Sequence, residues 1–89
     1  MELTVGSVVY SKAGHDIGRA YVVLSISGRA GYVAVADGKK KTIASPKIKN
    51  AKHLRYKGEF CRQVAEKLTE GTLKDCDLIY YLKEFDREE

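Results

Sequence analysis

The sequence predicts a mainly β domain followed by two short C-terminal helices, and three observations lead to that fold class. The chain has 89 residues, which make one domain with a small core, since a chain of this size buries only about 60 to 65% of the surface that its unfolded form exposes. Apolar residues up to Tyr56 come in short runs broken by glycines, as in strands joined by tight turns. After Gly58 the apolar residues recur with a helical period. This size excludes two-domain nucleotide-dependent enzymes, eightfold β/α barrels and transmembrane bundles.

Five strands are predicted in the first part of the chain, at residues 5–11, 19–26, 32–36, 39–44 and, as a short last strand, 49–54. Asp37-Gly38 between two extended runs is a strong hairpin signal, because both central residues of that turn need positive φ. Pro46 has no N–H to donate to a ladder, so it marks a corner before the last strand.

Short strands in such number would leave exposed edges if they formed an open sheet. Curling into a small barrel largely removes that liability, so we expect an SH3-like barrel over residues 1–57. Residues 58–89 would then form a helical extension packed on the barrel.

Two helices are predicted in this extension. Phe60, Val64 and Leu68 have i, i+4, i+8 spacing, with Cys61 and Ala65 widening the same stripe. Gly71 is placed to end the first helix in the left-handed conformation. Residues 72–75 (TLKD) have the form of a capping box that opens a second helix. The apolar residues available for burial on it are Leu73, Cys76, Ile79, Tyr80 and either Leu82 or Phe85.

The net charge of +4 is unevenly distributed. Residues 1–57 hold eleven Lys or Arg against three acids, whereas residues 58–89 hold five against nine. This asymmetry indicates either a polyanion-binding front with an acidic tail or simply a solvated surface. The acids of the tail are in turn either the solvated faces of two helices or a mimic of RNA that covers the basic front.

Two cysteines are too few for the disulfide framework of a small secreted protein. The N-terminal residues 1–6 (MELTVG) lack the basic and apolar regions of a signal peptide, and no apolar run approaches the ~18 residues needed to span a bilayer. We therefore expect a cytoplasmic protein without a membrane partner.

The loop from Gly14 to Gly18 (GHDIG) invites comparison with phosphate-binding loops. It does not fit the nucleotide-binding pattern, because three residues separate the glycines rather than four, no Lys-Ser/Thr follows, and a strand comes next instead of a helix. Its glycines supply positive φ in a wide turn. Whether the loop also binds a ligand is left open by its spacing.

Residues 6–26 (GSVVYSKAGHDIGRAYVVLSI) resemble a KOW motif, the alternating segment with a fixed glycine found in ribosomal proteins and transcription elongation factors. The continuation, with YVAVADGK at 32–39, Pro46-Lys47 and NAKHL at 50–54, resembles one branch more closely. That branch is the bacterial KOW-domain RNA-binding proteins related to the fourteen-e type of large-subunit ribosomal protein. The resemblance covers roughly residues 5–56, and in the rest of the chain only a helical extension is shared in kind.

The resemblance implies RNA binding on an SH3-like barrel, on or near the large ribosomal subunit. Ribosomal RNA is the implied partner, with ribosomal proteins as further neighbours. By position the motif glycine is Gly14, and the binding loop runs from Lys12 to Arg19 and includes His15, Asp16 and Gly18. The family usually has Arg or Lys where His15 stands, so one phosphate contact is expected to be weakened or pH-dependent.

Basic side chains in or beside the predicted turns point to the same surface, because Lys and Arg contacts to phosphates supply most sequence-independent affinity for nucleic acid. These residues are Lys12, Arg19, Lys39, Lys40, Lys41, Lys47 and Lys49. On a strand, alternation would put Lys39 and Lys41 on one face and Lys40 on the other. Four tyrosines are candidates for stacking on unpaired bases or for strand packing: Tyr10, Tyr21, Tyr32 and Tyr56.

Nothing in the spacing of the remaining polar residues predicts catalysis. Cys61, Cys76, His15 and His53 lack zinc-site spacing, and both cysteines are expected to be small core residues. No nucleophile is placed against a base. The chain is thus expected to be a monomeric, non-enzymatic RNA-binding protein of the ribosome or translation, without metal or cofactor. A protein–protein adaptor barrel and a transcription-elongation accessory factor are the alternatives.

Overall fold

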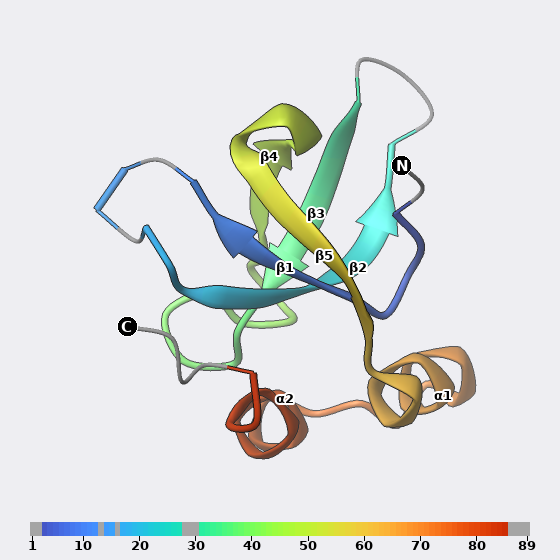
Figure 1. The fold of residues 1–89 in the computed structure, drawn as a ribbon. Coiled ribbons are helices and arrows are strands. Elements are labelled where there is room, and N and C mark those ends of the chain that lie inside the picture. Colours follow the sequence, from blue (N-terminus) through green and yellow to red (C-terminus); the bar gives the residue numbers. More distant parts are fainter. Residues whose placement is uncertain (1–2, 13, 16, 28–30, 86–89) are drawn as a thin grey trace.

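The computed structural model describes residues 3–12, 14–15, 17–27 and 31–85, and these form one antiparallel sheet and two helices (Figure 1). The elements are β1 (Ser7–Ser11), β2 (Ala20–Ile26), β3 (Tyr32–Ala36), β4 (Lys47–Asn50), the 3₁₀ turn η1 (Ala51–His53), β5 (Leu54–Phe60), α1 (Arg62–Glu70) and α2 (Asp75–Leu82). The strand order is β4-β3-β2-β1-β5, so the last strand pairs with the first. The predicted class, mainly β with two C-terminal helices, is confirmed.

The sheet is curled but not closed. Its two edge strands, β4 and β5, are joined by only the three residues of η1, so the edges must approach each other. Lys49 Nζ on β4 donates a hydrogen bond of 2.8 Å to Ser11 Oγ on β1, although β3 and β2 lie between them in the sheet. Within the described residues no ladder joins β4 to β5, so the structure shows an open sheet rather than the expected closed SH3-like barrel.

The reason for the opening is local to Asn50. Its Oδ1 accepts the N–H of Lys52 and starts η1, so β4 ends after four residues. The chain then turns before a ladder with β5 can form. Two bulges, one between Ser7 and Val9 and one between Val23 and Ser25, add bend to the sheet.

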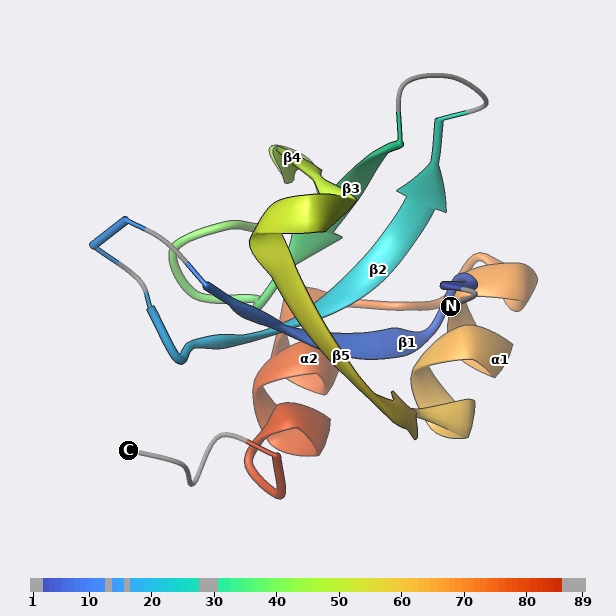
Figure 2. The ribbon, with the colours of Figure 1, turned by 45° about the horizontal axis from the view of Figure 1, so that its top comes forward.

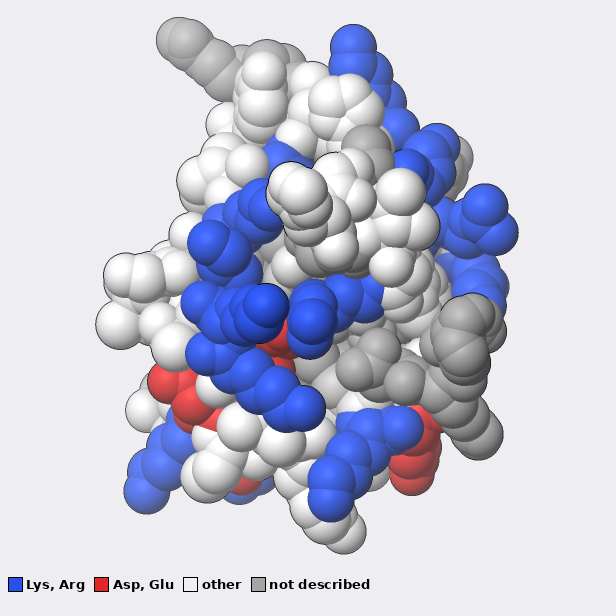
Figure 3. All heavy atoms as spheres, turned by 90° about the vertical axis from the view of Figure 1, so that its left-hand side faces the viewer, with Lys and Arg blue, Asp and Glu red and all other residues white. Residues whose placement is uncertain are grey.

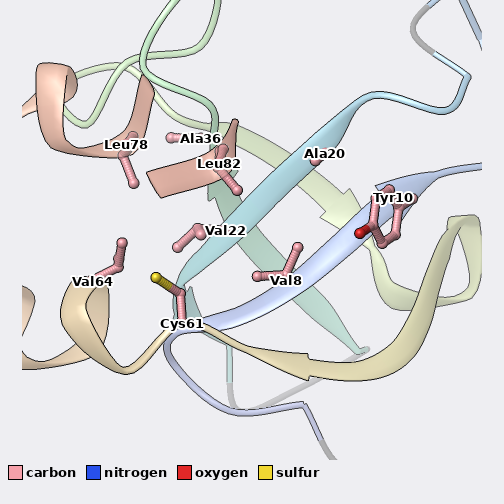
Figure 4. Packing of buried hydrophobic residues seen from close by; sticks show 9 residues of the cluster. All are labelled: Val8, Tyr10, Ala20, Val22, Ala36, Cys61, Val64, Leu78 and Leu82. Carbon is pink, nitrogen blue, oxygen red and sulfur yellow. The ribbon is translucent and has the colours of Figure 1, made fainter. Parts of the chain in front are cut away.

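Both faces of β1 and of the first part of β2 are buried. One cluster combines side chains of β3 and β5 with those of the strands between them, as the inside of a curled sheet requires: Val9, Tyr21, Val23, Val33, Val35 and Leu54. On the other face, α1 and α2 lie side by side against β1 and β2 (Figure 2). There Val64, Leu78 and Leu82 pack on Val8 and Val22 (Figure 4). Burial on both faces explains why β1 and β2 are apolar runs rather than alternating ones.

The predicted strand at 39–44 is wrong. Residues 37–46 form a loop, and the chain returns as β4 only at Lys47. The Asp37 carboxylate accepts the backbone N–H groups of Lys39 and Lys41, both at 3.0 Å. These donors are therefore held by a side chain instead of by a neighbouring strand. The predicted strand at 49–54 is also wrong in part, because residues 51–53 form η1.

The start of the helical region is later than predicted. β5 continues across the proposed boundary between residues 57 and 58, so Phe60 lies on a strand and is 49% exposed. Gly71 ends α1 with a left-handed φ of 78°, as predicted. Thr72 does not cap α2. The N-cap of α2 is Lys74, whose N–H donates to the Asp77 carboxylate at 3.0 Å.

The buried side chains of α2 differ from the predicted set. Leu78 and Leu82, one turn apart, face the sheet, whereas Cys76 and Tyr80 are exposed. The expectation that both cysteines are core residues holds for Cys61 and is wrong for Cys76.

Candidate nucleic-acid interface

The β1–β2 loop is held closed at its base by backbone hydrogen bonds. Ser11 N–H donates to the Arg19 carbonyl at 3.1 Å, and Gly18 N–H donates to the Ser11 carbonyl at 2.9 Å. Gly14 and Gly18 have φ values of 89° and 88°, which confirms that both supply positive φ. Lys12 and His15 are exposed on this loop, and Asp16 lies outside the described residues.

Asp37 organises a second segment, residues 37–41, which we call the lysine segment. It is 5% exposed, and its Oδ1 holds the N–H groups of Lys39 and Lys41. Its Oδ2 lies 3.4 Å from Arg19 Nη1, in an ion pair whose arginine is 31% exposed. One buried carboxylate therefore ties the lysine segment to the end of the β1–β2 loop.

The third segment is β4 with η1. Lys49 reaches Ser11 through its Nζ, and Lys12 N–H donates to the His53 carbonyl at 2.9 Å. Lys47 lies two residues before Lys49, hence on the same face of the strand.

Three segments far apart in the sequence thus meet on one side of the molecule. We call this the basic surface and define it by Lys12, Arg19, Lys39, Lys40, Lys41, Lys47 and Lys49. Figure 3 looks at the side toward which the β1–β2 loop projects, and Lys and Arg side chains gather across the middle of that face. The acid inside it, Asp37, uses Oδ1 for two backbone N–H groups and Oδ2 for Arg19.

Some sequence-based expectations for this surface are corrected. Lys39, Lys40 and Lys41 are in a loop, so strand alternation does not separate them; Lys39 and Lys40 are exposed and Lys41 is half-buried. Tyr10 and Tyr21 are buried, at 5% and 2% exposure, and cannot stack on bases. Tyr32 is exposed but pairs with Asn50, one residue along β4 from Lys49, and so lies on the opposite face of the sheet.

Sequence reasoning missed basic residues outside the turns. Arg55 and Lys57 are exposed on β5, and Lys57 Nζ lies 4.7 Å from the centroid of the Tyr10 ring. The sequence does carry a signal for them: Arg55 and Lys57 alternate with Leu54 and Tyr56, which pack inward. Lys83, just after α2, lines a pocket together with Arg19 and Lys39.

The described part of the chain contains no group of three or more His, Cys, Asp or Glu side chains that could hold a metal ion. No helix among those residues is long and apolar enough to cross a membrane. What the surface offers chemically is cations and hydrogen-bond donors, which suit an anionic partner.

The chain matches no protein-family model, and no curated protein is significantly similar to it. The resemblance to KOW proteins therefore stays a prediction from the sequence.

Proposed function

We propose that this protein is a non-enzymatic RNA-binding protein associated with the ribosome or translation. It binds RNA through the basic surface, by contacts of lysine and arginine side chains to backbone phosphates. The observation that carries the proposal is the convergence of three basic segments through specific hydrogen bonds: Lys49 to Ser11, Lys12 to His53, and Arg19 with the lysine segment to Asp37. Basic side chains that were merely solvated would not need hydrogen bonds that bring their segments together.

The physical chemistry of the surface favours a polyanion over a single acidic group. Seven cations on one face exceed what one carboxylate ligand would need, whereas a nucleic-acid backbone presents a regular row of phosphates. The resemblance of residues 5–56 to ribosome-associated KOW proteins supports RNA, and ribosomal RNA in particular, as that polyanion.

The same resemblance supports a finer description of the fold. We infer an SH3-like barrel whose closing ladder is left open. Pairing of the last strand with the first, and the 3₁₀ turn that links the two edge strands, support this description. The lysine segment and the β1–β2 loop are then neighbouring loops at one end of the barrel.

A salt titration of RNA binding tests the function. Each phosphate contact contributes about 0.7 to 0.9 to the slope of log affinity against log salt concentration. Changing Lys39 and Lys41 together to Gln should lower that slope by roughly 1.5 units and weaken binding to all sequences about equally. The matched control is the double variant Arg62→Gln and Lys67→Gln on α1, which lies on another side of the molecule (Figure 1) and should leave the slope unchanged.

Two outcomes contradict the proposal. If the slopes of wild type and the lysine variant coincide while circular dichroism shows both folded, the lysine segment does not contact RNA. If wild type shows no salt-sensitive RNA binding, the adaptor alternative becomes the better one. One observation favours that alternative: Ile48 and Tyr32 are exposed apolar side chains on the adjacent strands β4 and β3.

A further inference from the structure

A small pocket lies beside the basic surface, between the start of β2, the lysine segment and α2. Its basic lining is Arg19, just before β2, Lys39 of the lysine segment, and Lys83, just after α2. The apolar lining includes Ile79 and Leu82 of α2. Because α2 belongs to the acidic C-terminal part of the chain, a cation from its end in this pocket is unexpected from the charge distribution alone.

The charges of the lining favour an anion. Asp37 is the acidic member, and its Oδ1 is held by two backbone N–H groups while its Oδ2 pairs with Arg19. The carbonyl end of α2 carries partial negative charge, which disfavours an anion, but Lys83 at that end offsets it. Ile79 and Leu82 supply an apolar wall, and a low-dielectric wall strengthens electrostatic attraction beside it.

Arg19, which lines the pocket, has a donor without a partner among the described residues. Its Nε is buried and has no hydrogen-bond partner among the described residues, and its Nη1 makes only the long 3.4 Å contact to Asp37. Buried donors are nearly always paired, so this one calls for an acceptor that the described residues do not supply. A guanidinium presents its donors in a planar fork that matches the oxygens of a phosphate.

We propose that this pocket binds a phosphate group, with Arg19, Lys39 and Lys83 as its ligands. The inference rests on the proposed function in taking the phosphate to come from RNA, and it goes beyond that function by making α2 part of the interface. The C-terminal helix then contributes a phosphate contact as well as covering the sheet.

Titration of the full chain with inorganic phosphate, followed by ¹H–¹⁵N NMR, tests the pocket directly. The Arg19 Nε–H resonance should shift saturably with phosphate and not with chloride at the same ionic strength. The variant Lys83→Gln should reduce the affinity for phosphate several-fold, while Lys67→Gln on α1 should not. Lys83 and Lys67 are at the surface, so both variants should retain the wild-type amide spectrum. An unmoved Arg19 resonance, or equal responses of the two variants, would overturn the proposal.

RNA oligonucleotides then identify the source of the phosphate and separate the two proposals. Equal shifts of Arg19 by 5′-phosphorylated and 5′-hydroxyl forms of one oligonucleotide support an internal phosphodiester, whereas a shift with the phosphorylated form alone supports a terminal phosphate. Salt-sensitive RNA binding that leaves Arg19 unmoved rejects the pocket and keeps the RNA-binding function. A response to inorganic phosphate without RNA binding keeps the pocket, for a free phosphate, and rejects the RNA-binding function.

Discussion

At the scale of single residues, Asp37 has the largest organising role in the basic surface. It is buried, accepts two backbone N–H groups and pairs with Arg19. Asp37→Ala would leave those donors unsatisfied, so we expect a loss of about 2 to 3 kcal/mol in the free energy of unfolding. Asp37→Asn keeps one carbonyl acceptor and should lose less. Denaturant unfolding of both variants measures this, and equal losses would contradict the assignment of the two Oδ1 bonds.

Gly18 and Gly38 have nearly equal φ, so their alanine variants allow the cost of backbone strain to be measured apart from the cost of crowding. A Cβ on Gly18, at φ +88°, meets nothing within 4 Å, so Gly18→Ala should cost only the backbone strain of about 1 to 2 kcal/mol. A Cβ on Gly38, at φ +85°, would lie 2.5 Å from the Asp75 carbonyl oxygen. Gly38→Ala should therefore cost about 1 to 3 kcal/mol more, from overpacking against α2. Equal unfolding free energies for the two variants would show that the lysine segment does not press against α2.

At the scale of elements, α2 positions the lysine segment. Asp75 Oδ1 accepts the Ile43 N–H at 2.8 Å, and Gly38 packs against the first turn of α2. Asp75→Ala removes a negative charge, so electrostatics alone predicts tighter RNA binding. Loss of the loop's anchor predicts the opposite, and we expect binding to weaken about two- to five-fold, as loss of one or so hydrogen bonds implies.

Glu66→Ala on α1 is the charge-matched control for Asp75→Ala, since it removes one exposed acid far along the chain from the lysine segment. It should leave RNA binding unchanged or slightly tighter. Hydrogen exchange at the Ile43 amide gives an independent measurement and should accelerate in Asp75→Ala only. Tighter binding in both variants would mean that the anchor does not matter.

Several elements could be predicted because their signals are local. β3 has its predicted bounds, Gly71 ends α1 through its own backbone, and the positive φ of Gly14 and Gly18 follows from the need for a turn. The segment after Asp37 could not be predicted, because Asp-Gly signals a hairpin only when the Asp side chain does not bind the following N–H groups itself. The late start of α1 could not be predicted, because Phe60 fits a helical apolar stripe and a strand equally well.

The candidate site was predictable in composition but not in arrangement. Lys12, Arg19 and the lysine segment were found by their positions in or beside turns. Their meeting point depends on contacts between residues far apart in sequence, such as Lys49 with Ser11 and Arg19 with Asp37. Lys83 had no local signal at all, because its place in the pocket follows from how α2 packs on the sheet.

At the scale of the whole molecule, the two helices of the acidic C-terminal part cover one face of the sheet, and we expect their acids not to mask the basic surface. Val64, Leu78 and Leu82 are buried against the sheet, so deleting the helices would expose Val8 and Val22 and unfold the chain. Deletion therefore cannot test whether the acids mimic RNA. Neutralising acids on the surface of a folded chain can, and Glu66 and Glu70 on α1 are exposed.

The double variant Glu66→Gln and Glu70→Gln should change RNA affinity at 0.1 M salt by less than about two-fold, because exposed charges more than roughly 10 Å apart are largely screened at that salt concentration. If these acids instead cover the basic surface, their neutralisation should tighten binding several-fold at low salt, and the gain should vanish as salt rises. The measurement is the same salt titration used for the lysine variant, with unfolding by denaturant to confirm that stability is unchanged. A several-fold, salt-sensitive gain would assign the acidic part a regulatory role in addition to its structural one.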